Sequence, residues 1–107
     1  MPITIPRGKS DAVIEKISET LRAYEMDHPY AEIALYRQNS VSVRVRIIDP
    51  DFRGQDRVER SQKAWEYLDR LPDEAHADIS TLILLTPEET ATSFSNMNFE
   101  DPIPSEL

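Results

Sequence analysis

Between residues 41 and 89 the spacing of hydrophobic side chains changes twice. Residues 41–48 alternate apolar and polar side chains, which is typical of a strand with one covered face. Residues 57–71 carry apolar side chains at helical spacing, and Pro72 then ends the helix. Residues 79–85 form an apolar run, which predicts a strand that is covered on both faces or lies in the centre of a sheet. The order strand, helix, strand predicts a right-handed crossover with the two strands parallel.

A helix is predicted before these strands, with Ser10 or Asp11 as its N-cap. It should end near residues 27–28, because the residue before Pro29 disfavours helical geometry. The apolar stripe of this helix consists of Ile14, Ile17, Leu21 and Tyr24.

The period of two begins at residue 31, so the first two strands are expected to form a hairpin with a three-residue turn at 38–40. This turn length places the apolar side chains of both strands on one face. The expected cross-strand pairs are Leu35 with Val43, Ile33 with Val45, and Glu32 with Arg46 on the outer face.

These elements predict a single α+β domain over residues 10–93, in the order helix, strand, strand, helix, strand, helix. The sheet is expected to be mixed and three-stranded. The last helix should be short and should follow the capping run at residues 86–89. The expected core side chains are Ile14, Ile17, Leu21, Ile33, Leu35, Val43, Val45, Val58, Trp65, Leu68 and Leu84.

Outside this domain, residues 1–9 are predicted to be an extended lead-in and residues 94–107 an extended acidic tail, since prolines interrupt both segments. Phe94, Phe99 and Ile103 are the side chains able to attach the tail to the domain. Tyr67 lies off the apolar stripe of its helix and is expected at the surface.

The composition narrows the classes of function. The absence of cysteine excludes disulfides, thiolate nucleophiles and thiolate metal sites. The net charge of -8 opposes general binding to nucleic acid. Residues 37–70 are nevertheless locally basic, whereas residues 71–107 contain no Lys or Arg. With no membrane-length apolar run and no secretory signal pattern, a cytoplasmic location without membrane attachment is expected.

A set of short motifs resembles the BolA family, whose fold is a variant of the class II KH arrangement. The matching residues are Phe52, Gly54, Val58, Arg60 and the run Thr86-Pro87-Glu88-Glu89. The resemblance spans roughly residues 11 to 90. It implies a BolA-like fold and, as a function, metal or iron–sulfur cluster carriage with a glutaredoxin-like partner.

The residues at the family's functional positions differ here. Its two histidine positions correspond to Ser61 and Asp78, and the hairpin loop at 38–40 offers no cysteine or histidine. The only glycines, Gly8 and Gly54, cannot form the Gly-x-x-Gly loop with which KH domains clamp RNA. The chain therefore resembles a relative that kept the scaffold and lost both activities.

No other arrangement predicts a catalytic or metal site. His28 and His76 are far apart in the sequence and do not match known ligand spacings. A calcium or magnesium site at Asp49, Asp51 and Asp56 lacks the glycine and glutamate of a calcium loop. Turn formation accounts for the first two carboxylates, and helix capping accounts for the third.

The arginines are the remaining candidates, since guanidinium groups suit bidentate contact with carboxylate or phosphate. Three interpretations stay open: a solvated face with local ion pairs, docking of an acidic segment of a partner or of this chain's own tail, and nucleic acid as the least favoured. We expect a non-enzymatic interaction module or adaptor, without a cofactor, that binds an unknown protein or itself. The candidate partner-binding residues are Arg44, Arg46, Phe52, Arg53, Arg57 and Arg60.

Overall fold

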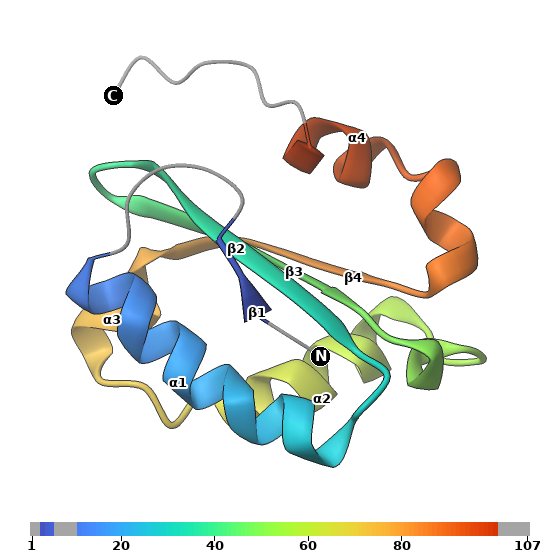
Figure 1. Cartoon of the computed structure of the whole chain (residues 1–107), viewed down its shortest axis with the longest axis horizontal. Coiled ribbons are helices and arrows are strands. Elements are labelled where there is room, and N and C mark those ends of the chain that lie inside the picture. The colour runs from blue at the N-terminus through green and yellow to red at the C-terminus, as the bar shows by residue number, and fades with distance from the viewer. Residues whose placement is uncertain (1–2, 6–10, 101–107) are drawn as a thin grey trace.

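The computed structural model describes residues 3–5 and 11–100 (Figure 1). Within these residues, no helix is long and apolar enough to span a membrane. The strands are β1 (Ile3–Thr4), β2 (Glu32–Asn39), β3 (Ser42–Ile48) and β4 (Ile79–Leu85). The α-helices are α1 (Ala12–Asp27), α2 (Arg57–Leu68), α3 (Asp73–Asp78) and α4 (Phe94–Glu100), and two short 3-10 helices are η1 (Pro50–Phe52) and η2 (Pro87–Ala91).

The four strands form one mixed sheet in the order β1-β2-β3-β4. β2 and β3 are antiparallel, whereas β1 is parallel to β2 and β4 is parallel to β3. The α+β class and the parallel crossover from β3 to β4 are therefore confirmed. The expected three-stranded sheet is wrong, because β1 pairs with β2 from within the segment predicted as a lead-in. β4 lies at an edge of the sheet and not in its centre.

The register of the hairpin differs from the prediction by two residues. Leu35 pairs with Val45, and Glu32 pairs with Ile48 instead of Arg46. The turn is shorter than expected because β2 contains a bulge between Arg37 and Asn39. Since the shift is an even number of residues, the same side chains still face the core.

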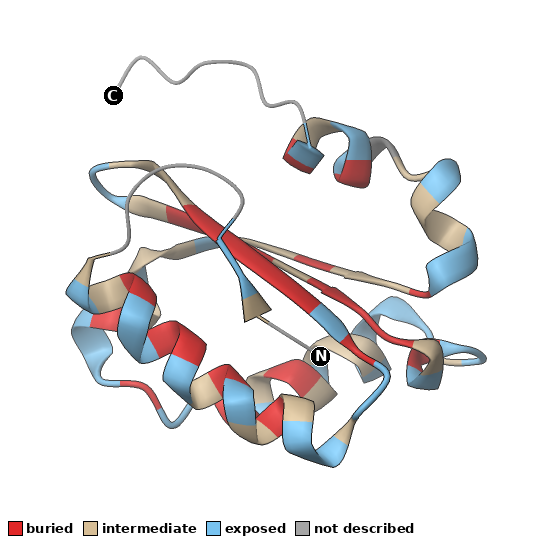
Figure 2. Ribbon diagram, viewed as in Figure 1, coloured by how far each residue is buried: buried red, intermediate tan, exposed pale blue. Residues whose placement is uncertain are grey.

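The layers of the molecule have α1, α2 and α3 on one face of the sheet and α4 on the other (Figure 1). Figure 2 shows the buried residues concentrated on the strands and on the helices beside them. α1 starts at its N-cap Asp11, whose Oδ1 accepts from the N–H of Ile14 at 2.9 Å, and it ends at Asp27 as predicted. The main core contains Ile14, Ile17, Leu21, Tyr24, Ile33, Leu35, Val43, Val45, Ile47, Phe52, Ala64, Tyr67 and Leu68.

Three predictions about α2 are wrong. The helix ends at Leu68, and Pro72 does not end it. Val58 is 63% exposed, whereas Tyr67 is only 8% exposed. The buried face of α2 passes through Ala64, Tyr67 and Leu68, so a tyrosine takes a place in the core. This is stable because the Tyr67 ring packs edge-on to Tyr24 while its hydroxyl donates to Asp27 Oδ2 at 2.6 Å.

The segment after residue 72 is more helical than expected. α3 lies between α2 and β4, where no helix was predicted, and the predicted short helix after β4 is the 3-10 helix η2. There the N–H of Thr86 donates to Glu89 Oε1 at 2.8 Å, as the capping run predicts.

The prediction of an extended tail is wrong for residues 94–100, which form α4. Phe99 is 1% exposed and packs against Tyr36, and the Tyr36 hydroxyl donates to the Phe99 carbonyl at 2.9 Å. Phe99 therefore attaches this segment to the sheet, as expected for one of the three hydrophobic candidates. Ile103 lies outside the described residues, as does the rest of 101–107.

Candidate functional site

Arg44 and Arg46 lie on the outer face of the sheet, where α4 covers them. Arg44 Nη1 donates to Asn98 Oδ1 at 2.7 Å, and Arg46 Nη1 donates to Asn96 Oδ1 at 2.9 Å. Arg46 also forms an ion pair with Glu100. In this structure both arginines are thus engaged by the chain's own C-terminal helix, and the expected pairing of Arg46 with Glu32 is absent from the described contacts.

Phe52 lies in the main core and is fully buried, so it fixes the turn after β3 without presenting its side chain to a partner. Gly54 follows with a φ of 78°, a conformation that favours glycine. Arg53 is exposed and forms an ion pair with Glu88. Asp56 caps α2 by accepting from the N–H of Glu59 at 2.9 Å, which agrees with its predicted capping role.

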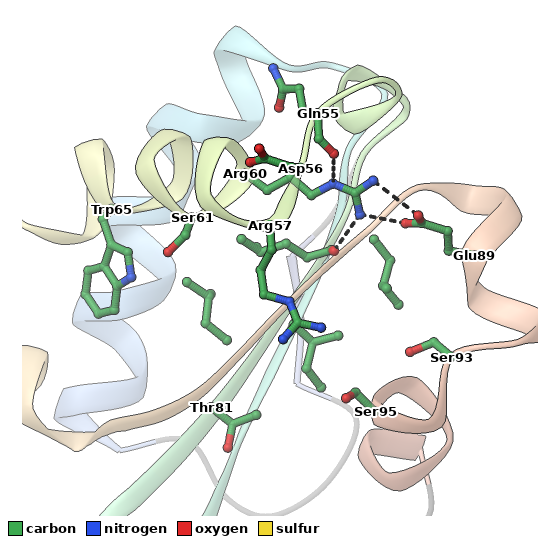
Figure 3. A pocket seen from close by; sticks show the side chains of 14 residues that line it. Gln55, Asp56, Arg57, Arg60, Ser61, Trp65, Thr81, Glu89, Ser93 and Ser95 are labelled. Carbon is green, nitrogen blue, oxygen red and sulfur yellow. Dashed lines mark hydrogen bonds and ion pairs between the residues drawn. The ribbon is translucent and has the colours of Figure 1, made fainter.

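Arg57 and Arg60 line a groove of about 630 Å³ that runs beside β4 (Figure 3). α2 forms one wall, β4 forms the floor, and the segment from η2 to α4 forms the other wall. The wall side chains include Gln55, Arg57, Arg60, Ser61, Trp65, Glu89, Ser93 and Ser95. Thr81, Leu82, Leu84 and Leu85 contribute from β4.

The floor of this groove is a free sheet edge. Among the described residues no strand pairs with β4 on the side away from β3. The Leu85 carbonyl accepts from the N–H of Asp49, so Leu85 points its backbone toward β3. Because backbone groups alternate along a strand, the N–H and C=O groups of Leu82 and Leu84 point into the groove. The Leu84 carbonyl accepts from Arg60 Nη1 at 3.1 Å, which agrees with this alternation.

Arg60 is held firmly at one end of the groove. Its Nη1 and Nη2 donate to the two carboxylate oxygens of Glu89 at 2.6 and 3.2 Å. Its Nε donates to the Gln55 carbonyl at 3.0 Å. The Arg60 guanidinium, together with the Thr86 backbone, lowers the pKa of Glu89 to about 2. Arg60 therefore stabilises the wall, and it already makes four hydrogen bonds with its five N–H donors.

Arg57 differs from Arg60 in having no partner within the part of the chain that the structure describes. Its side chain is exposed, and Figure 3 shows it extending from α2 across the groove toward β4. The hydroxyls of Thr81 and Ser95 lie along the same groove. Within the described residues, the arrangement thus combines the unpaired guanidinium of Arg57, the outward backbone groups of Leu82 and the N–H of Leu84, and the half-buried side chains of these two leucines.

The two positions where the family resemblance implies metal ligands do not suit an iron–sulfur cluster. Ser61 lines the groove, and Asp78 accepts from Arg37 Nη2 at 3.1 Å. Neither offers the sulfur or imidazole ligand that such clusters need.

Fold and site together define an α+β domain with an open sheet edge next to a groove that is lined by two arginines, Arg57 and Arg60, and two carboxylates, Asp56 and Glu89. Comparisons of the chain with protein-family models, curated proteins and solved structures found no match.

The sequence pointed to Arg57 and Arg60 but not to the groove. β4 is strongly apolar, which is typical of a central strand, and its place at the edge depends on the strand order. No local sequence signal separates Arg60, with its four hydrogen bonds, from Arg57, which has no partner among the described residues.

Proposed function

We propose that this chain is a non-enzymatic interaction module that binds an extended acidic segment of a partner protein as an added strand along β4. The proposal rests on one observation: the backbone of Leu82 and Leu84 faces an open groove beside the unpaired guanidinium of Arg57. It keeps the expected class of function but moves the contact surface from the arginines of β3 to α2 and β4.

Strand addition suits this edge physically. A bound peptide gains affinity from main-chain hydrogen bonds and specificity from pockets for alternate side chains. Here the outward backbone groups supply the hydrogen bonds, and the half-buried Leu82 and Leu84 supply apolar contact. Arg57 supplies a site for a carboxylate, which selects an acidic segment.

Charged side chains beside a sheet edge also protect proteins from aggregation. Edge protection alone predicts that the groove selects no peptide, whereas the proposed function predicts selection of a defined kind. The two alternatives therefore differ in a measurable outcome.

The test is selection of random heptapeptides displayed on phage by the immobilised full chain. We expect enrichment of extended sequences that carry Asp or Glu among β-branched residues, with the enriched peptides then measured by fluorescence polarisation. Arg57→Glu should weaken their binding at least tenfold. The variant should fold normally, because Arg57 is exposed and an acidic residue in the first turn favours a helix.

Arg22→Glu is the matched control, since it makes the same charge change at an exposed position of α1. Amide exchange of Leu82 and Leu84 should slow when the peptide binds. Absence of enriched peptides, or equal binding by Arg57→Glu and wild type, would overturn the proposal.

A further inference from the structure

Two segments that are separate in the sequence meet at the carboxyl end of β3. His28 is the C-cap of α1, whereas Asp49 is the N-cap of η1 and Asp51 lies within η1. His28 Nδ1 is 2.8 Å from Asp51 Oδ2 and 3.4 Å from Asp49 Oδ2. One ligand atom from each residue lies within 4.8 Å of the other two.

Asp49 is an unusual member of this group because it is a buried carboxylate, only 1% exposed. Within residues 3–5 and 11–100, no Lys or Arg forms an ion pair with Asp49 or Asp51, and His28 is their only basic neighbour. A buried carboxylate is costly unless a cation or several hydrogen bonds compensate it. The cluster therefore carries two carboxylates and lacks a permanent positive charge.

The surrounding contacts hold the cluster in a fixed orientation. The Tyr24 hydroxyl donates to Asp49 Oδ2 at 2.6 Å, and the N–H of Asp51 donates to Asp49 Oδ1 at 2.9 Å. The Tyr24 ring also stacks on His28 with centroids 4.3 Å apart. Such outer contacts orient metal ligands in known sites.

One imidazole nitrogen and two carboxylate oxygens form a ligand set suited to zinc or manganese. In a tetrahedral site with bonds of about 2.0 Å, ligand atoms are about 3.3 Å apart, whereas the three ligand atoms here lie within 4.8 Å of one another. A movement of the exposed Asp51 side chain would complete the geometry. Asp51 has a side chain that is 57% exposed, which leaves a route for the ion and for water ligands.

We propose that His28 Nδ1, Asp49 Oδ2 and Asp51 Oδ2 form a divalent-cation site of the zinc or manganese type, completed by water. The site is separate from the groove along β4 and does not depend on the proposed peptide binding.

The experiment titrates the chelator-treated full chain with zinc chloride and with manganese chloride in a calorimeter. We expect one site per chain for at least one of these ions. Asp51→Asn should weaken the binding of that ion at least tenfold. The substitution keeps the hydrogen bond from the backbone N–H of residue 51 to Asp49. His28→Gln should do the same.

His76→Gln is the matched control. His76 is a surface histidine that pairs with one carboxylate, since its Nε2 lies 2.9 Å from Asp69 Oδ1. Replacing His76 should leave the affinity for the cation unchanged. In ¹⁵N spectra of the imidazoles, the cation should shift His28 and not His76. The proposal is overturned if neither ion binds below millimolar concentration, if Asp51→Asn binds as wild type does, or if the His76 variant loses binding.

Discussion

At the scale of single residues, Arg57 and Arg60 show how identical side chains on one helix take different roles. Arg60 has acceptors on three sides, from Glu89, Gln55 and Leu84. A guanidinium with its donors satisfied stabilises structure but has little left for a partner. Arg57 has kept its donors available, because no described residue reaches it.

The ion pair of Arg60 with Glu89 predicts a pH dependence of stability. The pKa of Glu89 is about 2 in the folded protein, below its ordinary value of 4.5. The pair therefore stabilises the fold fully above about pH 4.5, and this stabilisation is lost as the pH falls toward 2. Glu89→Gln should lower the free energy of unfolding by roughly 0.5–1 kcal/mol at pH 7, since Glu89 is partly exposed.

Urea unfolding of both proteins across this pH range measures the effect. The difference between wild type and Glu89→Gln should shrink steadily below pH 4.5. A difference that is the same at pH 7 and near pH 2 would show that the charge of Glu89 does not contribute.

At the scale of elements, α4 has few local signals of its own and depends on its contacts with the sheet. The Ser93 hydroxyl accepts from the N–H of Asn96 at 3.0 Å and starts the helix. Isolated helices of this length are marginal in water, so packing must supply the stability. Phe99 supplies the buried apolar contact of α4, since the Arg46 guanidinium lies 4.7 Å from its ring centroid and Tyr36 packs beside it.

Removing the Phe99 ring should therefore release α4. Phe99→Ala is expected to lower the free energy of unfolding by up to about 3 kcal/mol, which is the lower end of the range for a buried phenylalanine. The loss stays at this end because α4 can detach without unfolding the main core. Amide exchange should become fast over residues 94–100 and remain slow in β3. Met97→Ala is the control, since Met97 lies on the same helix and is 52% exposed. Unchanged exchange in Phe99→Ala would contradict this account.

At the scale of the whole molecule, the two faces of the sheet are covered unequally. The inner face packs against three helices in a large core. On the outer face, the buried cluster of described residues consists of Ala34, Tyr36, Ile83 and Phe99. Less apolar area is removed from water on the outer side, so that side contributes less to stability. The central strands should therefore open only with the whole domain, and α4 should open alone.

Native-state hydrogen exchange in increasing urea tests this hierarchy. Amides in the middle of β2 and β3 should exchange with a steep dependence on urea, which marks global unfolding. Amides of α4 should exchange faster than those of β2 and β3, and their exchange rates should depend little on urea. Identical urea dependence in β3 and α4 would mean that both faces unfold as one unit.

The sequence alone determined the features that act over a few residues. Asp11 and Pro29 set the ends of α1, and Thr86 with Glu89 set the turn after β4. The period of two set which side chains of the hairpin face the core. From these, the α+β class and the parallel crossover followed, because connections between neighbouring strands are restricted.

Only the tertiary structure decided the features that depend on distant contacts. The bulge near Asn39 fixed the register, and a partner 54 residues away turned Arg46 from a candidate binding residue into a support for α4. The meeting of His28 with Asp49 and Asp51, and the open edge of β4, likewise required the chain to be folded. The physical reason is that caps and hydrophobic periods act locally, whereas burial and pairing depend on which distant segments meet.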